Sequence, residues 1–257
     1  MIIILAVILL LPLYRLIAVL CIYKRNRYHP SLSDKLVVIT GGSTGIGKYT
    51  VFDLYKSGAT VVTCGRSFAS VEQEVLTNKI MADEKGGVWD ENKNYTGKSN
   101  RFYFRRVDLS DLNQVKKFSD FIIALNRSID LLINNAGLAS DKYSVSPQGI
   151  EMQMAVNYLS HYYLVDLLMS KLSKNSRIIN VSSTVHTAVK VPPSGPINFD
   201  DYFHCKEEKY SNFPQYARTK LSQVIFTVGL QEVLKNHDIQ CKAVSLHPGI
   251  VKTSFMS

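Results

Sequence analysis

Short apolar runs alternate with helix-length stretches over most of the chain, and this alternation restricts the possible folds more than any other feature. The runs are rich in β-branched residues, while stretches such as Glu151–Leu172 and Gln215–Leu234 repeat apolar residues at helical spacing. Strands that alternate with helices in this way form a parallel, doubly wound sheet. We therefore expect an α/β fold with six strands: Leu36–Thr40, Thr60–Cys64, Phe102–Val107, Leu131–Asn134, Arg177–Val181 and Lys242–Leu246.

Two segments depart from this pattern. Asp83–Arg101 is polar and contains glycines, so we expect a solvated loop there. Thr187–Phe213 contains Pro192, Pro193 and Pro196, which cannot continue a regular helix. This second segment either borders the active site or is a surface excursion, and its place between two of the motifs described below favours the first interpretation.

The N-terminal segment differs in character from the rest of the chain. Residues 2–23 are almost wholly apolar, and at about 1.5 Å per residue they would span roughly 33 Å, close to the hydrocarbon thickness of a bilayer. Arg15 would cost about 2.5–3.5 kcal/mol in such a span, whereas each of the fifteen Leu, Ile and Val residues returns about 0.3–0.6 kcal/mol. We therefore predict that residues 1–30 form a membrane anchor built on a transmembrane helix, rather than a cleaved signal peptide.

Basic residues follow the apolar segment directly. Lys24, Arg25 and Arg27 lie on its C-terminal side, and the positive-inside rule then places residues 34–257 in the cytosol. We expect the anchor to lie in the endoplasmic reticulum membrane or a related lipid membrane. An in-plane or hairpin insertion stays open as an alternative, because Pro12 and Arg15 could mark a bend.

Composition excludes some classes of partner. The formal net charge of +9 suits an anionic cofactor or a lipid surface. Basic residues do not form a stripe interleaved with stacking aromatics, so we expect no nucleic-acid partner. The four cysteines are scattered without a CxxC pair, and the histidines lack metal-ligand spacing. These patterns argue against a disulfide framework and predict no metal site.

A glycine-rich turn follows the first predicted strand and precedes a helix. Glycines allow a tight turn and a close approach of the backbone to a pyrophosphate, and the helix N-terminus presents N–H donors to that anion. A Rossmann-type sheet with a dinucleotide site is therefore predicted. The expected contacts in the turn are Gly41, Ser43, Thr44, Gly45, Ile46 and Gly47.

The residues after the second strand indicate which dinucleotide binds. An NAD site usually has an acidic residue there, which holds the ribose 2′-hydroxyl. The residues directly after Cys64 are Gly65, Arg66 and Ser67, none of which is acidic, and Arg66 can pair with a 2′-phosphate instead. We therefore predict NADP(H) as the cofactor, with Asp108 and Leu109 after the third strand near its adenine.

Three side chains suited to proton chemistry come together at one edge of the predicted sheet. Tyr216 and Lys220 are four residues apart on a predicted helix and therefore share one face. Ser183 follows the fifth strand, and Asn134 ends the fourth. Ligands of a doubly wound sheet bind at the carboxyl ends of the strands, so Ser183 should face the same crevice as the glycine-rich turn.

Taken together, these motifs resemble the short-chain dehydrogenase/reductase family from about Lys35 onward. The matching residues are the Thr40–Gly47 turn, Asn134–Gly137, Ser183, Tyr216–Lys220 and Pro248-Gly249. Within the family the chain looks most like the retinol-dehydrogenase-like branch. The residues that match this branch are Gln148–Glu151, Val156–His161, Ile179–Ser183 with His186, and His247–Gly249.

The resemblance implies a role for each catalytic residue. Tyr216 would be the general acid in reduction and the base in oxidation, Lys220 would lower the Tyr216 pKa and hold the nicotinamide ribose, and Ser183 would bind the substrate carbonyl. Asn157 would hold a water in a proton relay. Free tyrosine titrates near 10, so bringing its pKa near neutrality takes roughly 4 kcal/mol from nearby cations. The further cofactor contacts implied are Asn135, Ala136, Gly137, Pro248, Gly249 and Thr253.

These features predict a membrane-anchored oxidoreductase that transfers a hydride between NADP(H) and a lipophilic alcohol or carbonyl of retinoid, steroid or lipid aldehyde type. The alternatives are a non-catalytic NADP(H)-binding sensor or interaction module, and a membrane organiser; self-association as a homo-oligomer stays open. The resemblance also implies a seventh strand and further helices after Gly249. We therefore expect residues 34–257 to lack the C-terminal part of the substrate lobe, with a short natural form that borrows a partner chain or the membrane as the alternative.

Overall fold

The computed structural model describes residues 31–67, 87–189, 207–249 and 251. The chain divides into two compact units, Met1–Ser31 and Leu32–Ser257, and the fold described below is that of the second. Among the described helices, none combines the length and the apolar character that crossing a bilayer requires. The predicted anchor, residues 2–23, lies outside the described part of the chain.

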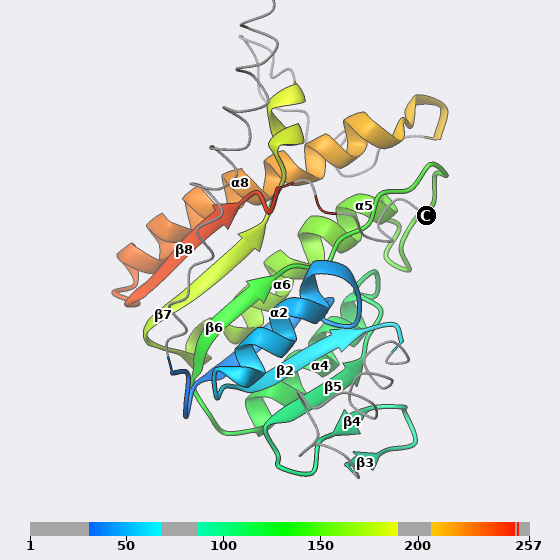
Figure 1. Cartoon of the computed structure of the whole chain (residues 1–257). Coiled ribbons are helices and arrows are strands. Elements are labelled where there is room, and N and C mark those ends of the chain that lie inside the picture. Colours follow the sequence, from blue (N-terminus) through cyan, green and yellow to red (C-terminus); the bar gives the residue numbers. More distant parts are fainter. Residues whose placement is uncertain (1–30, 68–86, 190–206, 250, 252–257) are drawn as a thin grey trace, which may run out of the picture. The chain divides into compact units, whose positions relative to one another are not determined.

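The described strands form one sheet in the order β3-β4-β5-β2-β1-β6-β7-β8 (Figure 1). From β5 to β8 every neighbouring pair is parallel. All six predicted strands are present, so the predicted doubly wound parallel sheet is confirmed. The strands are β1 (Leu36–Thr40), β2 (Thr60–Gly65), β3 (Val88–Trp89), β4 (Tyr95–Thr96), β5 (Phe102–Arg106), β6 (Ile129–Asn134), β7 (Leu172–Val181) and β8 (Cys241–Leu246).

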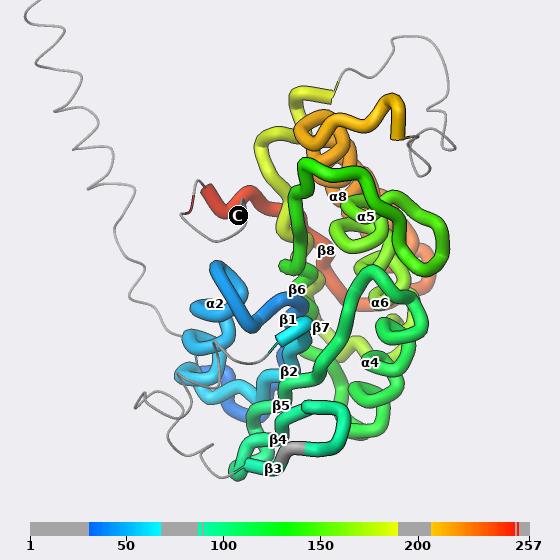
Figure 2. Tube along the Cα trace, turned by 90° about the vertical axis from the view of Figure 1, so that its right-hand side faces the viewer, coloured from blue at the N-terminus to red at the C-terminus, as the bar shows by residue number. Residues whose placement is uncertain are grey.

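Helices cover both faces of the sheet, with α2 on one face and α4, α6 and α8 on the other (Figure 2). Successive residues of β1 point to opposite faces: Leu36 and Val38 pack with the three-helix side, and Val37 and Ile39 pack with α2. The helices are α2 (Gly45–Lys56), α4 (Leu112–Ala124), α5 (Met152–Met154), the π-helix η2 (Ala155–Leu159), α6 (Ser160–Leu168), α8 (Asn212–Asn236) and the short 3-10 helices η3 (Met169–Lys171), η4 (Thr184–Ala188) and η5 (Glu207–Lys209).

The expected loop over Asp83–Arg101 is wrong in part, because β3 and β4 form an antiparallel hairpin that extends the sheet beyond β5. Tyr95 explains the difference: it is 5% exposed and packs against Phe102 with ring centres 6.3 Å apart. The guanidinium of Arg105 also donates to the Tyr95 carbonyl oxygen at 3.1 Å. One buried aromatic residue thus orders a segment whose composition is otherwise that of a loop.

The predicted helix Glu151–Leu172 is divided into several pieces. α5 begins after Glu151, whose carboxylate caps it, and the next turn, η2, is a π-helix centred on Asn157. α6 follows, and β7 already begins at Leu172, five residues before the predicted start. π-helical turns inside α-helices occur frequently at functional sites, which directs attention to Asn157.

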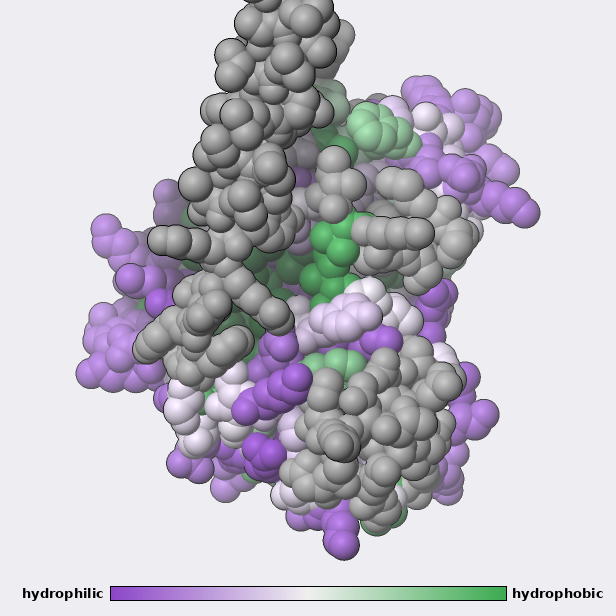
Figure 3. All heavy atoms as spheres, in the orientation of Figure 1, coloured by the Kyte–Doolittle hydropathy of each residue, from purple (hydrophilic) through white to green (hydrophobic). Residues whose placement is uncertain are grey.

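The proline-rich segment Thr187–Phe213 is described only at its two ends. Residues 190–206 lie outside the described part of the chain, and α8 begins at Asn212, so the last two residues of the segment are helical after all. On the face seen in Figure 1, hydrophilic residues lie around the periphery, and a small apolar area is exposed near the centre (Figure 3).

Candidate active site

The glycine-rich turn joins the carboxyl end of β1 to the start of α2. Gly41 and Gly45 have φ angles of +68° and +53°, a left-handed conformation that favours glycine. Gly47 is required for a different reason, because a Cβ atom there would lie 2.2 Å from the Gly41 carbonyl oxygen and 2.6 Å from the side-chain amide nitrogen of Asn135. The turn therefore has a closely packed backbone shape that larger side chains would disrupt.

α2 begins at Gly45 without a capping side chain. Thr44 is the N-cap residue, its side chain makes no capping hydrogen bond, and the first turn contains no acidic residue. Backbone N–H groups at an uncapped helix N-terminus, together with the helix dipole, favour a bound anion. The segment from Ser43 through Ile46 to Gly47 therefore fits the pyrophosphate of a dinucleotide.

The loop after β6 supports this turn from the other side. The Thr40 hydroxyl accepts hydrogen bonds from the backbone N–H groups of Asn135 and Ala136, each at 3.0 Å. The Asn135 side chain donates to the carbonyl oxygens of Thr40 at 2.9 Å and Gly41 at 3.3 Å. Asn135 and Ala136, predicted as cofactor contacts, thus fix the shape of the turn on which the cofactor would rest.

The predicted adenine side of the site lies at the ends of β2 and β5. Arg66 follows β2 and is exposed. A Cβ atom on Gly65 would come within 2.6 Å of the Ser43 hydroxyl oxygen, so the end of β2 touches the glycine-rich turn. Asp108 and Leu109 follow β5, which pairs with β2, and the Asp108 carboxylate accepts two hydrogen bonds within its own turn. The structure therefore brings these predicted residues to one edge of the sheet.

Lys220 is fixed at the same edge and is only 3% exposed. It lies one helical turn after Tyr216 on α8, with its Nζ atom 5.5 Å from the centre of the tyrosine ring. Nζ donates to the carbonyl oxygen of Val181 at 2.8 Å and to Gln223 Oε1 at 3.1 Å. A Cβ atom on Gly137 would be 3.7 Å from Nζ, so the ammonium faces the loop after β6.

Burial dominates the acid–base properties of this pair. It lowers the pKa of Lys220 to about 7 and raises the pKa of Tyr216 to about 12. The change at Tyr216 is opposite in direction to the one that catalysis near neutral pH requires, because burial removes the hydroxyl from water and Lys220 loses its charge above about pH 7. A protonated Lys220 and a cationic nicotinamide ring would both act against this effect.

Ser183 lies directly after β7, where η4 begins. Its hydroxyl accepts a weak hydrogen bond from the Val185 N–H at 3.4 Å, and His186 Nδ1 lies 2.6 Å from its carbonyl oxygen. The preceding residue, Ser182, donates through its hydroxyl to the Lys220 carbonyl oxygen at 2.8 Å. α8 packs against η4. The structure therefore brings the Ser183 segment next to the helix that carries the tyrosine and the lysine.

Asn157 is fully buried in η2 and all its polar groups are engaged. Its side chain accepts from the Leu138 N–H at 2.8 Å and donates to the Leu138 carbonyl oxygen at 2.9 Å. Its backbone carbonyl oxygen lies 3.0 Å from His161 Nδ1 and accepts from Gln223 Nε2 at 2.7 Å. Both lone pairs of this carbonyl are thus used by side chains.

His161 connects this carbonyl to the glycine-rich turn, and sequence reasoning missed that role. Its Nε2 atom lies 2.9 Å from the Thr40 hydroxyl, and burial lowers its pKa to about 4, so the ring is neutral. Because the Asn157 carbonyl can only accept, Nδ1 carries the hydrogen and Nε2 accepts from Thr40. A histidine in an apolar helix gives no sequence signal for such a link.

Glu151 is a second residue that sequence reasoning did not assign. It is buried, and its carboxylate accepts from the backbone N–H groups of Gln153 and Met154 and from Gln215 Nε2 at 2.7 Å. Gln215 directly precedes Tyr216 on α8. Glu151 therefore fixes the first turn of the helix that presents the tyrosine, and a glutamine beside a tyrosine carries no pattern by which this contact could be predicted.

The last predicted cofactor contacts follow β8. Pro248 and Gly249 lie just beyond the carboxyl end of this strand, and Gly249 has a φ angle of +86°. Thr253 lies outside the described residues. In the described ranges, no three His, Cys, Asp or Glu side chains come together as a metal site would need.

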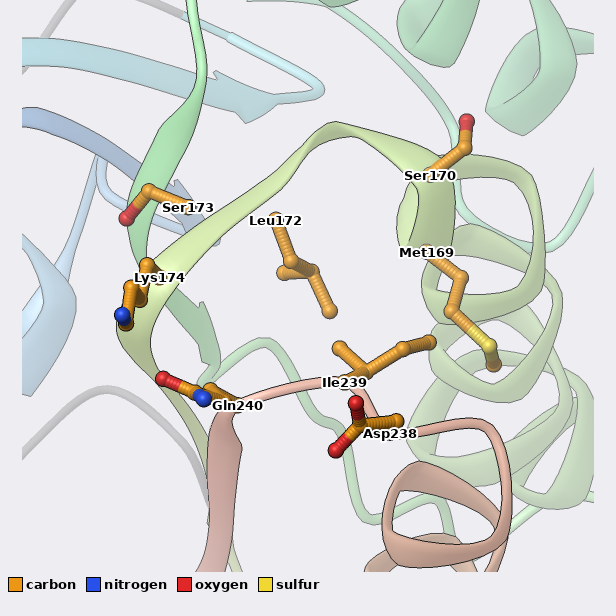
Figure 4. A pocket seen from close by; sticks show the side chains of 8 residues that line it. All are labelled: Met169, Ser170, Leu172, Ser173, Lys174, Asp238, Ile239 and Gln240. Atoms are coloured by element: carbon orange, nitrogen blue, oxygen red, sulfur yellow. The ribbon is translucent and has the colours of Figure 1, made fainter.

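A separate pocket has a volume of about 390 Å³, and Figure 4 shows the side chains that line it. It is formed where η3 leads into β7 and where the turn after α8 leads into β8, and its walls include Leu172, Lys174 and Ile239. This is the amino end of the two strands, opposite the carboxyl ends that carry Ser183 and Pro248. We therefore do not assign it to the substrate.

Comparison with known proteins is consistent with this site. Residues 35–192 match the family model described as short chain dehydrogenase. Human retinol dehydrogenase 13 is 33% identical over 225 residues, and bovine retinol dehydrogenase 12 is 34% identical over 228 residues. The alignments cover 87% and 88% of this chain but only 61% and 64% of the relatives, so the chain spans about three fifths of their length.

Solved structures share the fold. A protein from Mycobacterium paratuberculosis is 31% identical, with a TM-score of 0.68 over 88% of this chain and 71% of the other. Two more distant structures have TM-scores of 0.62: a short-chain dehydrogenase/reductase from Burkholderia phymatum in complex with NAD, and a blue fluorescent protein from a metagenomic library in complex with NADPH. Their identities are 20% and 22%; they cover 88% of this chain, and 69% and 78% of their own chains are aligned.

The family match covers more than half of the chain and includes the glycine-rich turn, Asn134–Gly137 and Ser183, all of which the fold brings to one edge of the sheet. Together with the similarity to retinol dehydrogenases across most of the sequence, it shows that this chain belongs to the short-chain dehydrogenase/reductase family and is retinol-dehydrogenase-like.

Proposed function

We propose that this chain is an NADP(H)-dependent oxidoreductase that transfers a hydride between the cofactor and a lipophilic alcohol or carbonyl of retinoid, steroid or lipid aldehyde type. One observation carries the proposal. The buried Lys220 ammonium lies one helical turn after Tyr216, and it donates to the carbonyl oxygen of Val181, which ends β7 two residues before Ser183. A protein that only binds a dinucleotide does not need these three groups at one edge.

The bound nicotinamide would supply or accept the hydride, and the protein would handle the proton. Ser183 is placed to hydrogen-bond the substrate oxygen, and Tyr216 to donate a proton to it in reduction or accept one in oxidation. Protonated Lys220 favours the tyrosinate by charge, and its third N–H is available for a hydroxyl of the nicotinamide ribose. Asn157 keeps Lys220 in place through the contacts of its carbonyl oxygen.

NADP(H) is preferred over NAD(H) in this proposal because Arg66 stands at the end of β2. The guanidinium can pair with a 2′-phosphate, and none of the residues Gly65, Arg66 and Ser67 is the acidic residue that would hold a 2′-hydroxyl. Asp108 and Leu109 would contact the adenine side, and Pro248, Gly249 and Thr253 the nicotinamide side.

The lipophilic substrate class rests on two features. Two of the relatives are named retinol dehydrogenases. The apolar N-terminal segment, residues 2–23, would anchor the enzyme in the endoplasmic reticulum membrane, where such substrates dissolve, with the catalytic unit on the cytosolic side. Residues 34–257 would form the catalytic unit.

Oxidation of NADPH by the purified full chain, measured with a panel of retinal, steroid and fatty aldehydes, tests this proposal. Tyr216→Phe should lower turnover by about 10²–10⁴-fold and leave NADPH affinity nearly unchanged, because the hydroxyl supplies the proton rather than binding energy. Tyr162→Phe is the matched control, since Tyr162 is 46% exposed on α6. Unchanged NADPH binding without turnover of any aldehyde would favour the sensor or interaction module instead.

The membrane orientation has its own test. Protease added to sealed microsomes should digest the catalytic unit, because Lys24, Arg25 and Arg27 set it on the cytosolic side. Deletion of residues 1–28 should release the protein from the membrane fraction. Protection of the catalytic unit from protease would contradict the proposed orientation.

A further inference from the structure

Gln223 lies beside the proposed proton site, and no role has been assigned to it so far. Its side-chain amide contacts both Lys220 and the Asn157 carbonyl. It lies one helical turn after Lys220 on α8 and is 1% exposed. Its Oε1 atom accepts from Lys220 Nζ at 3.1 Å, and its Nε2 atom donates to the Asn157 carbonyl oxygen at 2.7 Å. An ammonium can only donate and a carbonyl can only accept, so one orientation of the amide satisfies both partners.

The far end of this bridge is itself rigid. The Asn157 carbonyl belongs to the π-helix η2 and is also bound by His161, whose ring contacts Thr40 at the start of the glycine-rich turn. A planar amide that joins such a fixed acceptor to Lys220 removes the freedom of a long side chain that has several rotatable bonds. The lysine is therefore held from two sides, by Val181 and by Gln223.

We propose that Gln223 is a positioning residue that ties the Lys220 ammonium to the Asn157 carbonyl and so directs its remaining N–H toward the nicotinamide ribose. The inference deepens the proposed function, because it rests on the assignment of Lys220 to the ribose.

The same helix offers a matched control. Gln231 lies two turns further along α8, and its amide likewise bridges two partners, the Cys241 carbonyl oxygen at 3.4 Å and the Ala243 N–H at 2.9 Å. Both partners of Gln231 belong to β8. Gln231→Met therefore removes a comparable bridge from the same helix without touching Lys220, whereas Gln223→Met removes the proposed one at similar side-chain volume.

The first measurement is cofactor affinity, by fluorescence of NADPH and of NADH on the full chain, alongside the melting temperature. Gln223→Met should weaken binding of both cofactors by about tenfold, as loss of a hydrogen bond to a charged group implies. Gln231→Met should lower the melting temperature comparably but change affinity less than twofold. Gln223→Glu keeps an acceptor for Lys220 but loses the donor to the Asn157 carbonyl, so its cofactor affinity should stay lowered. Full recovery would mean that the contact with Lys220 alone, and not the tie to Asn157, sets the affinity.

The second measurement does not depend on the cofactor. With ¹³C-labelled lysine, the Lys220 signal, identified by its loss in Lys220→Met, reports the pKa of this ammonium by NMR. Gln223→Met should lower that pKa below the value in the parent, Gln223→Glu should raise it, and Gln231→Met should leave it unchanged. Tyr216 on the same helix and His161 from α6 are the titratable neighbours, and they are present in every variant.

These readouts separate the two levels of the proposal. If the parent binds neither cofactor, the proposed function fails and the NMR titration alone decides the role of Gln223. If the parent binds NADPH and NADH equally, only the cofactor preference fails, since the ribose is common to both. Equal effects of Gln223→Met and Gln231→Met on cofactor affinity and on the Lys220 pKa would overturn the positioning role.

Discussion

The glycine-rich turn and the lysine site lie at the same edge of the sheet but depend on different physical properties. The turn is made of backbone: a Cβ atom on Gly41 or Gly47 would overlap neighbouring atoms, Gly45 has a positive φ angle, and Asn135 bonds to carbonyl oxygens. The lysine site is made of buried side chains joined by hydrogen bonds around one ionisable amine. Substitutions should therefore fail by steric overlap at the turn and by electrostatics at the lysine.

The largest effect is expected at the turn, from Gly47→Ala. Its backbone is already helical, so alanine brings no conformational penalty, but its Cβ would lie 2.2 Å from the Gly41 carbonyl oxygen, which cannot move independently of the backbone. We expect a loss of at least about 3 kcal/mol of unfolding free energy, as for severe overpacking, and loss of NADPH binding. Denaturant unfolding measures the loss of unfolding free energy, and cofactor fluorescence measures the loss of NADPH binding.

Gly137→Ala is the control for this prediction. Its Cβ would meet nothing closer than Asn157 Oδ1 at 3.4 Å, an ordinary contact, so the unfolding free energy should change by less than about 0.5 kcal/mol. If both glycine variants lose stability equally, steric closure of the turn is not what distinguishes the two regions.

The next largest effect concerns the lysine site and depends on pH. The folded-state pKa of Lys220, about 7, lies below the ordinary 10.5, so between these values the unfolded chain binds more protons and stability rises with pH. Lys220→Met lacks this term. The variant's unfolding free energy minus that of the parent should therefore be about 2–3 kcal/mol higher at pH 6 than at pH 9, which means that the variant is relatively more stable at the lower pH. A difference that does not vary with pH would mean that burial does not lower the pKa of Lys220 in the folded chain.

The smallest effect is expected at Arg66, which belongs to neither the backbone turn nor the buried network. Arg66→Ala removes an exposed guanidinium, so it should weaken NADPH binding by about tenfold and leave NADH binding and thermal stability unchanged. Comparing the two cofactors in one titration series controls for general damage. Equal affinity of the parent for both cofactors would remove the basis of the proposed NADP(H) preference.

The two regions also differ in how far the sequence predicts them. The turn follows from local residue types, because glycines in a strand–turn–helix context allow only a few backbone shapes, and β1 has the expected bounds, Leu36–Thr40. Tyr216, Lys220 and Ser183 follow from the resemblance. The partners of these residues do not follow from it. The contact of Gln223 with Asn157 spans 66 residues of sequence and that of His161 with Thr40 spans 121, and helical periodicity does not encode contacts over such separations.

The same limit explains the two corrections to the fold. The β3–β4 hairpin depends on the burial of Tyr95 against Phe102, a tertiary contact within a polar segment whose composition indicates a loop. The π-helix at Asn157 depends on the loop after β6, which binds the asparagine side chain on both its oxygen and its nitrogen. In each case long-range packing overrides the local preference that the sequence indicates.

The order of the strands has a consequence for how the protein behaves while it folds. At one end of the described sheet the outermost strand, β3, has two residues, which is too short to template pairing with another chain. At the other end of the described sheet lies β8, with six residues, paired only with β7 within the described part of the chain; its Val244 and Leu246 are 42% and 40% exposed. We expect β8, the longer of the two outer strands of the described sheet, to be the first site of intermolecular association during refolding, and Val244→Lys should slow aggregation without altering the cofactor turn.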